Sequence, residues 1–229
     1  MRSIPDRLKR LRVGSGDVGF SVILAIQALI IFVVAPLAAT ASASVELIEM
    51  LRFGLAATTI LIVARNASVQ AVVGAAFAAT LIATLHWRLG QTASVIQAVK
   101  IVITILFDLV VAAVVGFAAF RPGRVTVHRI LGAVILYLYV ALVFADLYRL
   151  AAMILTPSFS GLPTGPRARF SGLLYFSLSS LTTAGAADIV AIHPFIRSLA
   201  SLEAVIGQLF PATLLARLVT LHATAEMKD

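Results

Sequence analysis

A short apolar run followed closely by a long one is the feature that most constrains the fold of this chain. The short run, Ser171–Leu181, would rise only about 16 Å as a helix, against a membrane hydrocarbon core of about 30 Å. A turn of small residues at 182–188 follows, and then a full-length apolar segment, Phe195–Leu221. This order predicts a re-entrant hairpin. Because non-helical backbone at membrane depth survives only inside protein or beside a water-filled cavity, we expect partner subunits around it.

The composition places the whole chain in a membrane. Of 229 residues, 61% are hydrophobic and 12% are charged, and the mean hydropathy is +1.05, which excludes a soluble domain. The absence of cysteine excludes disulfides and thiolate metal sites. The net charge of +8 resides at the ends of apolar segments, where it orients helices, so we expect lipids and not nucleic acid as its partner.

Six apolar segments are long enough to cross a bilayer. We therefore predict an all-α polytopic membrane protein with six transmembrane helices plus a re-entrant short helix and loop. A cleavable signal peptide is the alternative for the first segment, because Ala41-Ser42-Ala43 has the form of a cleavage site, but its apolar run exceeds a signal core. The predicted spans are Val18–Ala39, Val45–Val63, Ser68–Leu85, Ala93–Phe120, Ile130–Leu150 and Phe195–Leu221.

The charge pattern divides the chain and orients it in the cell membrane. Lysine and arginine accumulate on the cytoplasmic side of a span, which predicts that both termini are cytoplasmic and that the 182–188 loop faces outward. The predicted parts are a basic cytoplasmic arm at 1–17, a four-helix membrane domain at 18–120, a basic cytoplasmic linker at 121–129, a hairpin domain at 130–221 and a cytoplasmic tail at 222–229.

The hairpin domain resembles the pore domain of the potassium-channel-like superfamily. Residues 182–188 read Thr-Thr-Ala-Gly-Ala-Ala-Asp, where the usual filter motif is Thr-Thr-x-Gly-Tyr-Gly-Asp. Thr182, Thr183, Gly185 and Asp188 match it, and Gly207 lies where the inner helix of that family often bends. The resemblance implies a homotetramer whose selectivity filter consists of backbone carbonyls. The implied filter residues are Thr182, Thr183, Ala184, Gly185, Ala186, Ala187 and Asp188.

Two alanines depart from this motif. Ala186 replaces the tyrosine that braces the filter, and Ala187 replaces the second glycine. In the family this glycine adopts a left-handed conformation, so we expect Ala187 to be strained by about 1–2 kcal/mol there. The resemblance thus implies a passive channel for monovalent cations such as K⁺, weakly selective among them. The alternatives are a non-conducting structural or regulatory subunit and a secondary transporter.

The last span carries three residues that a channel could use as an inner cavity or gate. Glu203 either lines the cavity and attracts cations or lies behind the filter and binds the short helix. Gly207 is either a packing glycine or a hinge. Pro211 removes a helical hydrogen bond, so we expect a kink near the cytoplasmic half.

Charges within the first four spans are the remaining candidates for function, because charge is costly inside a membrane. Glu46 lies at the very start of the second span, and the candidates deeper in the spans are Glu49, Arg52, Lys100 and Asp108. An ion pair of Glu49 with Lys100 would fix helix packing, whereas Lys100 and Asp108 would serve a proton relay in a transporter. One lysine in the fourth span is too little charge for steep voltage dependence. Because the sequence shows no catalytic order, metal-ligand spacing or phosphate loop, we predict neither an enzyme nor a cofactor.

Overall fold

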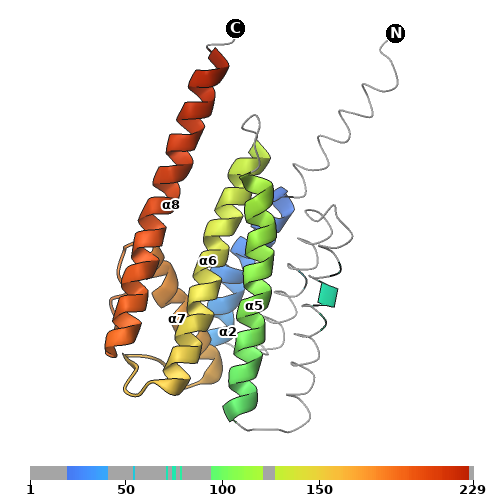
Figure 1. The fold of residues 1–229 in the computed structure, drawn as a ribbon. Coiled ribbons are helices and arrows are strands. Elements are labelled where there is room, and N and C mark those ends of the chain that lie inside the picture. Colours follow the sequence, from blue (N-terminus) through green and yellow to red (C-terminus); the bar gives the residue numbers. More distant parts are fainter. Residues whose placement is uncertain are drawn as a thin grey trace.

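The structure is a computed structural model that describes residues 20–40, 54, 71, 74, 75, 78, 94–120 and 127–226. Within these residues the regular secondary structure is helical except for one two-stranded sheet (Figure 1). Four of the helical segments are long and apolar enough to cross a membrane: Phe20–Leu37, Val95–Phe117, Arg129–Ile154 and Pro194–Ala216. A polytopic helical membrane protein is therefore confirmed. The predicted second and third spans, with Glu49 and Arg52, lie outside the described residues apart from five isolated helical positions, 54, 71, 74, 75 and 78.

The first span changes its helical geometry part of the way along. Residues 20–29 are α-helical, η1 (Ile30–Val34) is a π-helix, and α2 (Ala35–Thr40) completes the segment. Pro36 explains the change, because proline lacks an N–H and its ring clashes with the carbonyl four residues earlier, and a wider π-turn accommodates both effects. Gln27 is fully buried and donates a hydrogen bond from Nε2 to the carbonyl of Ile135, which joins this segment to the next helices.

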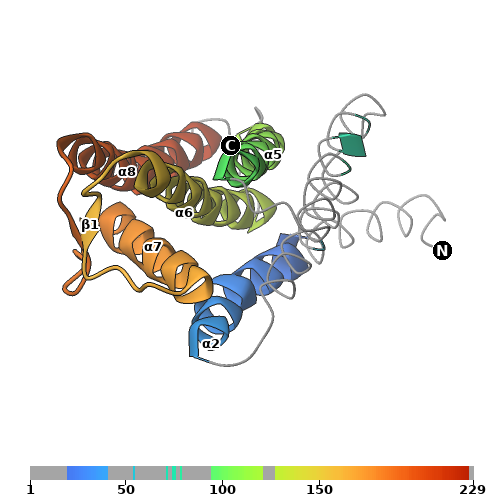
Figure 2. The ribbon, with the colours of Figure 1, turned by 90° about the horizontal axis from the view of Figure 1, so that it is seen from below.

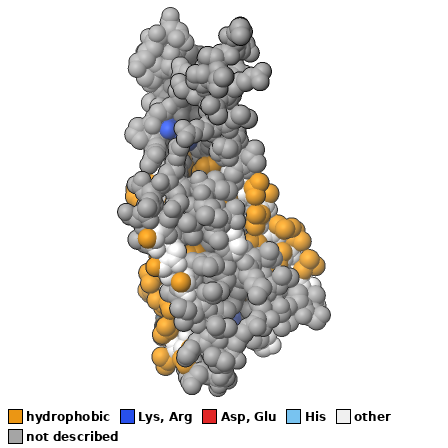
Figure 3. Space-filling view, turned by 90° about the vertical axis from the view of Figure 1, so that its right-hand side faces the viewer, with side chains coloured by type: hydrophobic (Ala, Val, Ile, Leu, Met, Phe, Trp, Pro, Cys, Tyr) orange, Lys and Arg blue, Asp and Glu red, His pale blue; other side chains and the backbone are white. Residues whose placement is uncertain are grey.

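Helix α6 (Val127–Ile154) is the centre of the described structure. It packs against α5 (Ser94–Ala119), α7 (Pro166–Leu181) and α8 (Pro194–Glu226), and α7 also contacts α2 (Figure 2). The main buried cluster joins the first span, α5 and α6, and a second cluster joins α6, α7 and the start of α8. The surface in Figure 3 shows mostly hydrophobic side chains among the described residues, as expected for a chain surrounded by lipid.

The observed helix bounds differ from the predicted ones mainly at their polar ends. Helix α6 begins at Val127, so the predicted linker at 121–129 ends inside the helix, and α8 continues to Glu226 through most of the predicted tail. Helix α7 begins five residues before the predicted Ser171 because Pro166, which has no N–H to leave unpaired, occupies its first turn. With 16 residues α7 is about 24 Å long, still too short to cross a bilayer.

Candidate functional site

The carboxyl end of α7 and the 182–188 loop form the candidate site. Thr182 caps the helix: its amide N–H donates to the carbonyl of Leu178 over 3.0 Å, and its Oγ1 donates to the same carbonyl over 2.7 Å. The loop then turns back over the last turn of α7. The amide of Thr183 donates to the Ser180 carbonyl over 3.0 Å, and the amide of Gly185 donates to the Ser179 carbonyl over 3.1 Å.

Two loop residues adopt the left-handed backbone conformation. They are Thr183, with φ 57°, and Gly185, with φ 78°. Thr183 is the first residue after the helix cap, where glycine usually allows a helix to end in a left-handed residue, so threonine costs about 1–2 kcal/mol there. The expected strain at Ala187 is wrong, because its φ is not in the left-handed region. The physical reason is that this loop folds back on α7 as a helix-terminating turn.

The side chain of Thr183 is held from α8. Gln208 donates a hydrogen bond from Nε2 to Thr183 Oγ1 over 2.7 Å, and both side chains are exposed in the single chain. Strained backbone conformations persist at functional sites where the surrounding structure supports them. The hydrogen bond between Gln208 and Thr183 therefore attaches the amino-terminal end of the loop to α8.

One residue before Gln208, at Gly207, α8 lies directly against the end of α7. A Cβ atom on Gly207 would lie 1.7 Å from the carbonyl oxygen of Leu181, so only glycine fits at this crossing. The same carbonyl accepts a hydrogen bond from the hydroxyl of Tyr137 in α6 over 3.2 Å. Gly207 is thus in close packing contact with α7, which is the first of the two roles that the sequence left open.

Glu203, one turn before Gly207, lies behind α7 and is fully buried. Its Oε1 lies 2.5 Å from the Ser177 hydroxyl of α7, and its Oε2 accepts a hydrogen bond from the Tyr148 hydroxyl of α6 over 2.6 Å. The sequence allowed Glu203 either to line the cavity or to bind the short helix from behind the loop, and the structure has the second arrangement. The rings of Tyr148, Phe159 and Phe176 pack around this point with centroids 5.1–6.0 Å apart.

A small sheet holds the carboxyl-terminal end of the loop. Strand β1 (Phe159–Ser160) pairs antiparallel with β2 (Val190–Ala191). Gly161, with φ 76°, follows β1, and a Cβ there would lie 1.8 Å from the carbonyl oxygen of Asp188. Arg197 at the start of α8 donates from Nε to the carbonyl of Ala191 over 2.8 Å. The segment around Asp188, whose side chain is exposed, is therefore attached to the loop between α6 and α7.

Pro211 lies three residues after Gln208, and α8 is continuous through it. Because proline has no N–H, the carbonyl of Gly207 lacks its usual helical donor. Phe210 directly precedes this proline. Its ring centroid lies 5.5 Å from that of Tyr137 in α6 and 6.2 Å from that of Phe120 at the end of α5. These aromatic contacts support α8 just before the proline.

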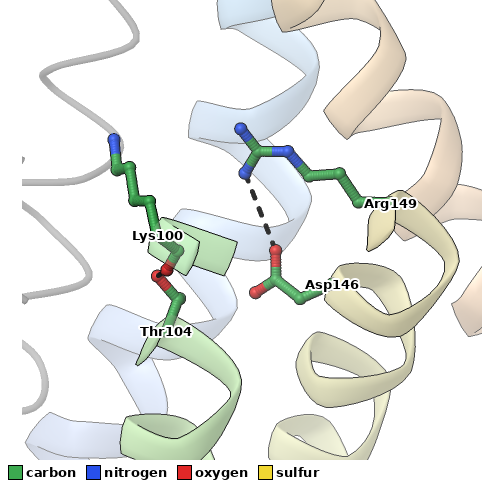
Figure 4. Close-up of polar contacts among 4 residues, drawn as sticks. All are labelled: Lys100, Thr104, Asp146 and Arg149. Carbon is green, nitrogen blue, oxygen red and sulfur yellow. Dashed lines mark hydrogen bonds and ion pairs between the residues drawn. The ribbon is translucent and has the colours of Figure 1, made fainter. Parts of the chain in front are cut away.

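The intramembrane charges lie apart from this site, on α5 and α6. Asp108 is buried within α5, and Lys100 lies two turns earlier on the same helix. Arg149 lies over the buried carboxylate of Asp146, with its Nη1 3.8 Å from Oδ1, and Lys100 points away from that pair in this view (Figure 4). The Lys100 carbonyl accepts a hydrogen bond from the hydroxyl of Thr104 over 3.0 Å.

Sequence reasoning assigned only some of the residues that hold the site in place. It singled out Glu203 and Gly207 by their spacing of four on one helix face, but it gave no role to Gln208, Tyr148 or Gly161. The position of Gln208 beside Gly207 was the available signal for its contact with the loop. Nothing in the sequence pattern pairs Gly161 with Asp188, because that contact depends on how two loops meet.

Together these features describe a helical membrane protein in which a short helix and a strained loop pack between two longer helices. Residues 143–223 match the model of a family described as an ion channel. The matched segment contains part of α6, all of α7, the 182–188 loop and most of α8. This match supports an ion-channel domain and the superfamily that the hairpin domain resembles. No curated protein and no solved structure matches the chain.

Proposed function

We propose that this protein is a potassium-channel-like cation channel, through which monovalent cations pass passively across the cell membrane. The observation that carries the proposal is the coincidence of the ion-channel match at 143–223 with a short helix, a loop with two left-handed residues and a long helix packed as one unit. We propose further that α7 is re-entrant, that the full chain has six spans and that both termini are cytoplasmic.

Assembly around the loop is the second part of the proposal. Helix α8 exposes Leu202, Val205 and Leu209, which recur at helical spacing and are 53%, 53% and 58% exposed in the single chain. The polar loop cannot face lipid, because unpaired backbone groups are costly there, so it requires neighbouring copies that enclose water. A homotetramer with the four loops around one axis meets both requirements.

In this assembly the loop supplies the ion path. Carbonyls from Thr183 to Ala187, with the Thr183 hydroxyl, would replace part of the hydration of a cation. The carboxyl end of α7 carries the negative end of the helix dipole, which favours a cation beside it. Asp188 is exposed at the outer side of the loop, where its charge would concentrate cations.

Weak selectivity among monovalent cations follows from two features of the loop. Discrimination between cations needs several carbonyl rings of defined number and field strength. Ala186 lacks an aromatic ring and packs only a methyl group against the buried cluster behind the loop. The loop also folds back on α7 through the amides of Thr183 and Gly185, and we infer that it offers fewer carbonyl rings than the family motif would. A tenfold preference for one cation is equivalent to about 1.4 kcal/mol. The missing aromatic support and the smaller number of carbonyl rings are enough to remove a preference of that size.

Flux from purified protein in liposomes tests the proposal. We expect Rb⁺ and Na⁺ tracers to equilibrate without a proton gradient, and reversal potentials in K⁺/Na⁺ gradients to show a preference below tenfold. Empty liposomes and liposomes with heat-inactivated protein are the controls. No flux above these controls would indicate a non-conducting subunit, and flux that requires a proton gradient would indicate a transporter that uses Lys100 and Asp108.

A further inference from the structure

Three oxygen–oxygen contacts form a continuous chain that joins α6, α7 and α8. Tyr148 Oη lies 2.6 Å from Glu203 Oε2, and Glu203 Oε1 lies 2.5 Å from Ser177 Oγ. Ser177 Oγ in turn lies 2.8 Å from the carbonyl oxygen of Ala141. All three distances are in the range of O–H···O hydrogen bonds, so each needs a proton between its two oxygens.

The two hydroxyl groups supply only two of the three protons. The Tyr148 hydroxyl donates to Glu203 Oε2, and the Ser177 hydroxyl has one proton for two neighbours, Glu203 Oε1 and the carbonyl of Ala141. If Glu203 were an ionised carboxylate, Ser177 Oγ would face a second acceptor at hydrogen-bond distance without a proton. A carboxylic acid supplies the missing one: Oε1–H donates to Ser177 Oγ, and the Ser177 hydroxyl donates to the carbonyl of Ala141.

The surroundings of Glu203 favour the same protonation state. Glu203, Tyr148 and Ser177 are each 0% exposed, and aromatic and aliphatic side chains of the buried cluster around Tyr148 enclose them. In the part of the chain that the structure describes, no lysine, arginine or histidine pairs with Glu203. An ionised carboxylate in such an apolar place exchanges its hydration for hydroxyl donors alone, with no cation beside it, whereas a neutral acid with all its hydrogen bonds formed has no charge to desolvate.

We propose that Glu203 carries a proton at neutral pH and acts as a neutral positioning residue, which holds α7 between α6 and α8 through Ser177 and Tyr148. Glu203 lies one turn before Gly207, and Ser177 lies one turn before the carboxyl end of α7. The hydrogen-bond chain therefore fixes the part of α7 that precedes the 182–188 loop. It adds no negative charge behind the loop, so the cations of the proposed pore are not attracted by Glu203.

Infrared spectroscopy of the full-length protein tests the protonation state without any requirement for ion flux. Uniform ¹³C-glutamate labelling shifts the carbonyl band of a protonated glutamic acid, and we expect such a band at pH 7, where an ordinary glutamate is ionised. The band should disappear in Glu203→Gln. If the wild-type protein has no such band, or if the band is undiminished in Glu203→Gln, the proposal is wrong.

Substitutions distinguish a neutral donor from a merely well-packed side chain. Glutamine reproduces the hydrogen bonds of the acid, because its Nε2 donates to Ser177 and its Oε1 accepts from Tyr148. We expect Glu203→Gln to keep the melting temperature, and Glu203→Leu and Ser177→Ala to lower it by several degrees. Ser201→Ala on the exposed side of α8 is the matched control for Ser177→Ala. A Glu203→Gln variant as unstable as Glu203→Leu would contradict the proposal.

Ion flux shows separately whether the proposed channel depends on this network. Where the wild type conducts, Glu203→Gln should retain its flux and its K⁺/Na⁺ permeability ratio within about twofold, because neither form carries charge. A clear loss of cation preference in Glu203→Gln would mean that Glu203 is ionised and attracts cations, which overturns the proposal. Absence of flux in the wild type contradicts the proposed function alone, since the infrared band and the melting temperatures do not depend on it.

Discussion

Gln208 and Thr183, which are 25 residues apart in the sequence, are joined by a hydrogen bond of 2.7 Å from Nε2 of the amide to Oγ1 of the hydroxyl. The bond uses a lone pair of Oγ1 that a cation would otherwise approach, and it places positive N–H groups beside that oxygen. The same contact supports a threonine in the left-handed conformation. In the proposed channel, Gln208 therefore weakens cation binding at the inner end of the loop.

Replacing Gln208 with leucine should strengthen cation binding at Thr183. Leucine keeps approximately the size of glutamine but has no N–H donor, so Oγ1 becomes available. We expect the K⁺ concentration for half-maximal liposome flux to fall about fivefold, the equivalent of one hydrogen bond of about 1 kcal/mol. Gln208→Leu in a Thr183→Val background should have no such effect. An identical shift in both backgrounds would show that Gln208 acts by another route.

Replacing Gly207 with alanine should destabilise the packing of α8 on α7. The new Cβ would lie 1.7 Å from the Leu181 carbonyl oxygen, and both partners belong to rigid helices. Despite the better helix propensity of alanine, we expect a loss of about 3 kcal/mol, at the upper end of the cost of overpacking. Thermal unfolding followed by circular dichroism measures this loss. Gly165→Ala is the control, because a Cβ at Gly165 meets nothing within 4 Å, and equal melting temperatures would refute the prediction.

Replacing Gly161 with alanine should detach the loop between α6 and α7 from the segment around Asp188. Alanine is strained at φ 76°, and its Cβ would overlap the Asp188 carbonyl oxygen. Because the contact lies between loops, we expect a local effect: about tenfold faster hydrogen exchange at 158–162 and 188–192, with unchanged exchange in α6. Mass spectrometry of exchanged peptides resolves these segments. Unchanged protection around Asp188 would mean that the two loops do not depend on this contact.

Single cysteines test the proposed topology, and the natural chain has no cysteine that would interfere. We expect an impermeant maleimide to label Ser160→Cys from outside the cell. Arg124→Cys, which lies in the basic linker, should react only after the membrane is permeabilised. Labelling of both positions from the same side would disprove the six-span arrangement with cytoplasmic termini.

The fourth span should not act as a voltage sensor. Helix α5 contains one basic residue, Lys100, and one acidic residue, Asp108. Steep voltage dependence needs about 3–4 gating charges per subunit, each equivalent to about 2.3 kcal/mol per 100 mV. We expect currents in planar bilayers to change less steeply than e-fold over about 6 mV, the limit that one charge in each of four subunits sets. A gating charge of several elementary charges per subunit would place a sensor elsewhere in the chain.

The sequence was sufficient to predict the order and approximate bounds of α5, α6, α7 and α8, because apolar length and the contrast between short and long runs determine them. Helix ends were less predictable. Val127–Arg129 were assigned to a linker by their polarity, yet they continue α6. In a membrane protein, polar residues extend a helix beyond the apolar core at little cost, so hydropathy marks the end of the lipid and not the end of the helix.

The interior of the candidate site was only partly predictable. Glu203 and Gly207 stand out because a buried acid and a glycine are unusual in an apolar helix, and both contact α7. The strain assigned to Ala187 was wrong, since it assumed the backbone path of the family motif, whereas the left-handed residues are Thr183 and Gly185. A loop path depends on which amides find acceptors, here the carbonyls of Ser179 and Ser180, and no residue pattern encodes that choice.

The hydrogen bond that is missing at Pro211 allows the last part of α8 to bend there as a lever. The helix continues from this point to Glu226, a lever arm of about 22 Å at 1.5 Å per residue. On such an arm a rotation of about 10° at the proline moves the far end by about 4 Å, while Phe210 stays in contact with Tyr137. Four such arms around one axis would convert a small bend at each proline into a change in the width of the pore. Gly207 and Gln208, which contact α7 and the loop, would not need to move.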